Sequence, residues 1–177
     1  YRLTPEEFVQ YLAHFVKDLG VSVVGGCCGT TKEHIRRLVN AVGDLSPRPR
    51  AVDVVPSASS LYQAVPLHID PAPVIIGERT NANGSKLFRD LLAREDWEGI
   101  VAMGREAVKE GAHMVDVCAA YVGRDEKRDM QEIISRFNTQ VQLPIVIDST
   151  EPSVIEEALR LIGGRAIINS INLEDGG

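Results

Sequence analysis

Two adjacent cysteines, Cys27 and Cys28, are the residues of this sequence whose type and spacing most directly suggest chemistry. They follow a β-branched run at 21–24, which predicts a short strand. Thr30 and Glu33 come next and have the spacing of a helix capping box. Two thiolates placed where a strand passes into a loop could hold a soft metal ion such as zinc.

Other interpretations of the cysteine pair stay open at this point. Buried cysteines are often inert, small hydrophobic residues, and adjacent cysteines can form a strained disulfide. A catalytic zinc ion takes about three protein ligands and a structural one about four. The remaining cysteine, Cys118, lies far along the chain. Either a further ligand comes from outside this sequence, or the pair is not a metal site.

Composition excludes several classes of protein. The chain has 177 residues, of which 44% are hydrophobic and 25% charged, as is typical of globular proteins. A formal charge of -6 without a basic run argues against nucleic-acid binding. No apolar stretch approaches the roughly 20 residues of a membrane span. Three cysteines do not make a secreted disulfide framework, and we expect a cytoplasmic location.

The chain divides into three segments by its pattern. Residues 1–44 predict helix, strand and helix, with helices from Thr4 to 19 and over 32–42. Residues 45–72 are rich in proline and serine and predict a linker with some attached structure. Residues 73–177 return to alternating strands and helices. Strands are predicted at 74–77, 114–117, 145–147 and 166–168, and helices at 97–111, 127–141 and 152–161, which indicates a parallel sheet.

Polar side chains follow each predicted strand of the third segment. Any one of them could simply cap a helix. Together they should converge at the carboxyl ends of the strands, where barrel folds place their chemistry. Carboxylates only accept hydrogen bonds and amides do both, which suits the edge of a heterocycle such as a pterin. The residues are Glu78, Asn81, Asp116, Asp148 and Asn169.

Four motifs resemble those of the pterin-binding methyltransferase family. They are Gly-Glu-Arg-Thr-Asn at 77–81, Val-Asp-Val at 115–117, Ile-Asp-Ser-Thr at 147–150 and Ile-Asn-Ser-Ile at 168–171. Independently, Gly-Gly-Cys-Cys-Gly-Thr at 25–30 is similar to the last zinc loop of homocysteine methyltransferases. The order of the two resemblances is that of cobalamin-dependent methyltransferases that join a homocysteine barrel to a folate barrel.

The resemblance implies two (β/α)8 TIM-type barrels, both incomplete in this chain, joined by the proline-rich linker. The first would end at residue 44 and the second would begin at 73. Cys27 and Cys28 would be two of three zinc thiolates, with the third before Tyr1. Zinc would activate the thiol of homocysteine. The predicted pterin-binding residues are Glu78, Asn81, Asp116, Asp148 and Asn169, and no catalytic residue is assigned.

The implied reaction passes a methyl group from 5-methyltetrahydrofolate through cobalamin to homocysteine, giving methionine and tetrahydrofolate. Cobalamin-binding and reactivation domains of the same polypeptide, the latter using S-adenosylmethionine, would lie outside this chain. One departure is Cys118, where several relatives have asparagine. Two alternatives remain: a zinc homocysteine methyltransferase with another methyl donor fused to a second barrel, and a non-catalytic scaffold between domains.

Overall fold

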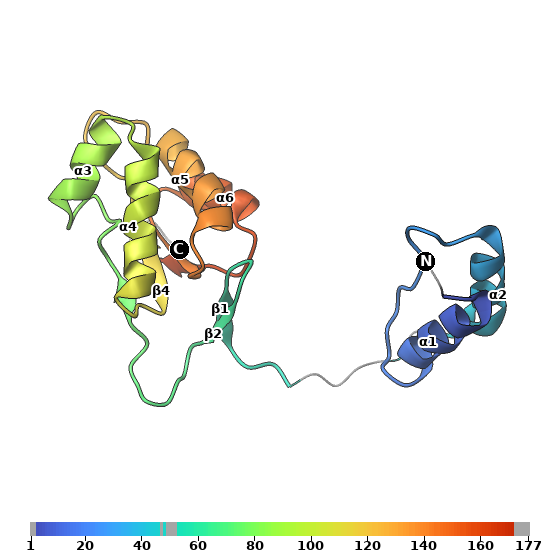
Figure 1. Ribbon diagram of the computed structural model, residues 1–177. Helices are drawn as coiled ribbons and strands as arrows, with labels where there is room; N and C mark the ends of the chain where they lie inside the picture. Colours follow the sequence, from blue (N-terminus) through green and yellow to red (C-terminus); the bar gives the residue numbers. More distant parts are fainter. Residues whose placement is uncertain (1–2, 47, 49–52, 172–177) are drawn as a thin grey trace. The chain divides into compact units, whose positions relative to one another are not determined.

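The computed structural model describes residues 3–46, 48 and 53–171 (Figure 1). Two linker prolines, Pro47 and Pro49, therefore lie outside the described residues. The chain forms two compact units, Tyr1–Val54 and Val55–Gly177, and each is described by itself. In the described part of the chain, no helix is both long and apolar enough to cross a membrane. The division at residues 44 and 73 stays a prediction.

The first unit contains helix α1 (Pro5–Lys17) and helix α2 (Lys32–Val42). Helix α1 begins with a capping box between Thr4 and Glu7. The side chain of Thr4 accepts from the backbone N–H of Glu7, and the side chain of Glu7 accepts from the backbone N–H of Thr4. The expected capping box of α2 is shifted by one residue. Thr31 is the N-cap and His34 is its partner, so the predicted pairing of Thr30 with Glu33 is wrong.

The strand expected at 21–24 is not formed. The N–H of Val21 donates to the carbonyl of Phe15 at 3.0 Å, which ties the run to the end of α1. Val23 is 87% exposed. A strand needs a neighbour for its backbone donors and acceptors, and no strand of the described residues lies beside this run.

The second unit is built on a parallel sheet, as predicted. Its strands β3 (Ile76–Gly77), β4 (Met114–Val117), β5 (Ile145–Asp148) and β6 (Ile167–Asn169) lie side by side in chain order. The connecting helices are α4 (Trp97–Lys109), α5 (Glu126–Gln140) and α6 (Pro152–Leu161). Helix α3 (Lys86–Ala93) precedes α4 and was not predicted.

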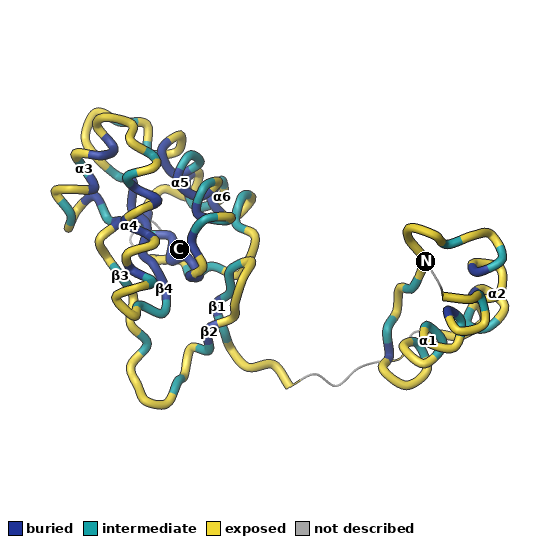
Figure 2. The backbone as a smooth tube through the Cα atoms, in the orientation of Figure 1, coloured by how far each residue is buried: buried dark blue, intermediate teal, exposed yellow. Residues whose placement is uncertain are grey.

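The helices of this unit pack on one face of the sheet, and Figure 2 shows buried segments in dark blue along α4, α5 and β4. Strand residues Val115, Val117 and Ile147 point to that face and pack with Phe88 and Phe137 from α3 and α5. Fully burying a side chain of this size stabilises a fold by roughly 1.5–3 kcal/mol. This core fixes the strands that carry the polar residues of interest.

A hairpin closes the amino-terminal part of the opposite face. It consists of β1 (Ser57–Ser59) and β2 (Ala64–Pro66), which pair antiparallel within the segment interpreted as a linker. Ala58 and Val65 of the hairpin pack with Met114 and Val146 of the sheet. The hydroxyl of Tyr62 donates to the carbonyl of Thr139 at 2.6 Å. Within the described residues, the hairpin leaves the carboxyl-terminal end of the same face, the open end, uncovered.

Candidate functional site

The open end of the sheet face carries three of the predicted polar side chains. Asp116 pairs with Val146 and Asp148 pairs with Asn169 in the parallel register. Side chains alternate between faces along a strand. Asp116, Asp148 and Asn169 therefore share the face of Met114 and Val146, which the hairpin contacts. The polar residues begin where the cover of the hairpin ends.

Asn81 joins the two carboxylates at this end. Its Nδ2 atom donates to Oδ2 of Asp116 and to Oδ2 of Asp148, both at 2.8 Å. Its Oδ1 atom accepts from the backbone N–H of Asn83, also at 2.8 Å. The structure thus brings together three of the five predicted pterin residues through one carboxamide.

The carboxylate of Asp116 is buried, with only 4% of the residue exposed. Burial raises the pKa of Asp116 above its ordinary value. The hydrogen bond from Asn81 opposes this shift, while the charges of Asp148 and Glu78 add to it. The side-chain oxygens of Asp116 and Asp148 supply hydrogen-bond acceptors at the open end, which suits a ligand that presents N–H donors.

The other two predicted residues lie nearby without joining these hydrogen bonds. Glu78 is exposed and acts on Asp116 through its charge. Asn169 is exposed at the end of β6, and its backbone carbonyl accepts from the N–H of Ser149 at 3.0 Å. Within the described residues, neither side chain makes a hydrogen bond, so both are free to meet a ligand.

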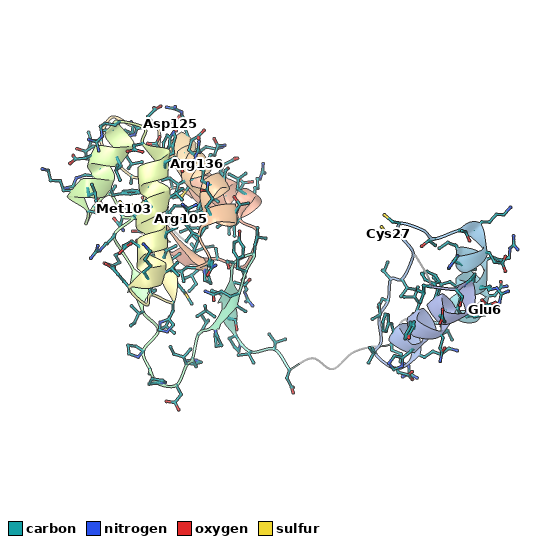
Figure 3. All side chains as sticks on the ribbon, viewed as in Figure 1. Glu6, Cys27, Met103, Arg105, Asp125 and Arg136 are labelled. Carbon is teal, nitrogen blue, oxygen red and sulfur yellow. The ribbon has the colours of Figure 1, made fainter. Side chains whose placement is uncertain are left out.

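The cysteine pair lies in the first unit, in the loop before α2 (Figure 3). The sulfur atoms of Cys27 and Cys28 are 3.5 Å apart, and both residues are exposed. The loop is held by Thr30, whose Oγ1 accepts from the N–H of Cys27 at 3.0 Å. Gly26 allows this turn, because a Cβ atom there would stand 2.3 Å from the Thr30 side chain.

The spacing of the two sulfur atoms fits joint metal binding. Two thiolates on one tetrahedral zinc ion, each about 2.3 Å from the metal, stand roughly 3.8 Å apart. Hydrogen bonds from the backbone and side chain of Cys28 lower the pKa of Cys27. The described residues contain no group of three or more His, Cys, Asp or Glu that could hold a metal ion. Within the described residues, the two sulfur atoms alone therefore do not make up a metal site.

Comparison with known proteins finds two separate family matches, one within each compact unit. Residues 77–176 match the profile of the family described as pterin binding enzyme. Residues 1–42 match that of homocysteine S-methyltransferase. The pterin match covers more than half of the chain. The chain belongs to the pterin-binding enzyme family.

Two relatives match over nearly the whole chain. Methionine synthase of Mycobacterium tuberculosis is 47% identical over 176 residues, which is 99% of this chain and 15% of the relative. Methionine synthase of Mycobacterium leprae is 45% identical over 181 residues, which again is 99% of this chain and 15% of the relative. The chain thus spans about 15% of the length of these curated relatives.

The second unit also holds one polar residue beside this site, Asn83, that sequence reasoning missed. Nδ2 of Asn83 lies 3.5 Å from the sulfur of Cys118, directly beside the Asn81 cluster. Burial raises the pKa of Cys118 to about 11, so this thiol stays neutral. The hydroxyl of Ser149 donates to Glu126 at 2.6 Å. An asparagine in a turn is too common to mark Asn83 from sequence alone.

Proposed function

We propose that this chain is part of an enzyme that transfers a methyl group from 5-methyltetrahydrofolate to homocysteine, giving methionine and tetrahydrofolate. Cobalamin would be the methyl carrier, bound with its reactivation domains and their S-adenosylmethionine outside this chain. Support comes from the ordered pair of family matches and from relatives that carry the name methionine synthase.

The observation that carries the pterin half of the proposal is the bridge between Asp116 and Asp148. Two carboxylates held by Asn81 at the open end of the sheet form a dense set of acceptors. A pterin ring presents an amino group and a ring N–H side by side, which such a set can bind. Asp148 and Asn169 are proposed to hydrogen-bond the ring. Glu78, Asn81 and Asp116 complete the proposed site.

Cys27 and Cys28 carry the homocysteine half. We assign them as two zinc ligands, with a third ligand outside the described residues. Bound zinc would act as a Lewis acid that lowers the pKa of the homocysteine thiol, so that the nucleophilic thiolate is present at neutral pH. The exposed position of both sulfur atoms leaves them accessible to a metal ion and a small thiol.

The fold follows from the same proposal. Four parallel strands in chain order, joined by helices on one face, are what one side of a TIM-type barrel contains. We propose two such barrels, each incomplete in this chain and joined by the segment 45–72. A cytoplasmic location belongs to the proposal too, since a reducing compartment keeps adjacent thiols free for a metal.

The test separates the two halves of the reaction in the full-length protein. Asp148→Asn should weaken 5-methyltetrahydrofolate binding by about 10-fold or more, the value of a hydrogen bond to a charged group. It should spare methyl transfer from preformed methylcobalamin to homocysteine. Cys27→Ala should do the reverse and remove bound zinc. Asp90→Asn, an exposed position on α3, is the matched control for Asp148→Asn.

The alternatives give different results in this experiment. Equal loss of both half-reactions in Asp148→Asn would contradict the pterin assignment. Full retention of zinc in Cys27→Ala would refute the ligand role. If homocysteine is methylated from another donor and Asp148→Asn has no effect, the enzyme uses a different methyl donor. If neither variant changes activity, the chain is a non-catalytic scaffold segment.

A further inference from the structure

The carboxamide of Asn81 is almost fully used within the protein. An asparagine side chain offers two N–H donors and two acceptor positions. Both donors of Asn81 are taken by Asp116 and Asp148, and one acceptor position is taken by the N–H of Asn83. Only one position is left for a ligand. Asp148, by contrast, uses Oδ2 alone, and its Oδ1 receives no hydrogen bond from a described residue.

The backbone around Asn81 is held as firmly as its side chain. Residue 81 forms an isolated parallel bridge with Cys118 at the end of β4. The N–H of Cys118 donates to the carbonyl of Thr80 at 3.2 Å, and the N–H of Ala82 donates to the carbonyl of Cys118 at 2.9 Å. The carbonyl of Asn81 accepts from Ser85 at 2.9 Å, where α3 begins. Such a residue has little freedom to turn toward a substrate.

We propose that Asn81 is a positioning residue, which orients the Asp148 carboxylate toward the pterin and makes no contact with the pterin itself. This inference rests on the function proposed above and assigns different roles to residues of the same site. Asp116 anchors one N–H of Asn81, and the other N–H then fixes Oδ2 of Asp148. Oδ1 of Asp148 is left to accept from the ligand.

The arrangement has a clear physical purpose. Two carboxylates close together in a partly buried site repel each other and would turn apart. An amide placed between them satisfies one oxygen of each and keeps both side chains in a single orientation. An oriented acceptor binds a planar ring edge more tightly than a mobile one, because no ordering is required on binding.

A double-mutant cycle in the full-length protein tests this role, with the Kd for 5-methyltetrahydrofolate as the readout. Hydrogen bonds to charged groups predict about 10-fold weaker binding for Asn81→Ala and about 100-fold for Asp148→Ala. If Asn81 acts through Asp148, the double variant binds about as weakly as Asp148→Ala. If Asn81 contacts the pterin directly, the losses multiply to about 1000-fold. Multiplying losses overturn the inference.

Two further measurements make each result decisive. Repeating the cycle with the milder Asp148→Asn keeps it measurable if Asp148→Ala binds too weakly. Steady-state methyl transfer should show a raised KM and a kcat within about twofold for Asn81→Ala. A merely structural defect would lower kcat at constant KM. Asn40→Ala, an exposed change on α2, is the control.

The proposed function and the inference fail in different ways. If Asp148→Ala and Asp148→Asn leave the Kd for 5-methyltetrahydrofolate unchanged, the pterin site itself is wrongly assigned. If the Asp148 variants weaken binding and the fold-loss from Asn81→Ala multiplies with theirs, the pterin site stands. Only the positioning role of Asn81 is then overturned.

Discussion

Gly164 lies so close to Ser59 that a Cβ atom on the glycine would stand 2.1 Å from the Ser59 carbonyl oxygen. The backbones are also joined by two hydrogen bonds of 2.9 Å between Ser59 and Arg165. The hairpin and the chain entering β6 therefore meet backbone to backbone, and no side chain fits between them. The closure of the amino-terminal end of the sheet depends on this contact.

We expect Gly164→Ala to lower the free energy of unfolding of the second unit by about 1–3 kcal/mol, the usual cost of overpacking. Urea unfolding followed by fluorescence of Trp97, the single tryptophan of the chain, measures this unit. Gly84→Ala is the control, because a Cβ atom there would meet no heavy atom within 4 Å. An equal effect of the two substitutions would contradict the close contact.

The three cysteines should differ sharply in reactivity. Cys118 is buried with a pKa of about 11, whereas Cys27 and Cys28 are exposed. Because the thiolate is the reactive form, we expect iodoacetamide to label the pair at least ~100-fold faster than Cys118 in metal-free protein at neutral pH. Peptide mass spectrometry over time gives the rates, and urea-unfolded chain is the control. Similar rates in the folded chain would refute the burial of Cys118.

Asp116 should make stability depend on pH in a defined direction. Its pKa is raised in the folded state, so the folded chain keeps this proton at pH values where the unfolded chain has lost it. The free energy of unfolding then falls as pH rises from the ordinary Asp pKa of about 3.9 through the raised value. Asp116→Asn has no proton to lose and avoids this fall.

We therefore expect Asp116→Asn to be more stable than the wild type at neutral pH, with the difference shrinking toward about pH 3. Urea unfolding at several pH values, again followed by Trp97, measures the difference between the two proteins. Asp90→Asn, which removes the carboxylate of an exposed residue on α3, is the control. If the difference in free energy of unfolding between the wild type and Asp116→Asn does not change with pH, burial of the Asp116 charge does not destabilise the fold.

Much of the second unit could be predicted from sequence, because apolar strands and amphipathic helices alternate there with clear boundaries between them. Strand 114–117 and helix 152–161 have the predicted bounds, and helix 97–111 ends two residues early, at Lys109. Helix α3 was missed because only eight residues separate its capping serine from the next turn. The hairpin was missed because its strands have three residues each and β2 ends in Pro66.

The run at 21–24 shows the limit of local patterns. β-branched residues favour extended backbone, but a strand is a property of two neighbouring segments. The same limit applies to the polar site. The position of Asp116 and Asp148 at the carboxyl ends of two predicted parallel strands was enough to predict that they lie near each other. That Asn81 bridges them depends on a loop folding back to the end of β4, which no local pattern specifies.

The hairpin has a practical consequence for anyone who wishes to excise the pterin-binding part. A fragment cut at residue 73, where the strand pattern restarts, would lack Ala58 and Val65 and would expose Met114 and Val146 to water. It would also lose the Tyr62 hydrogen bond to Thr139. A fragment that keeps the hairpin packed on the sheet starts at Val55, where the second unit begins. This is some 18 residues earlier than the motifs alone would suggest.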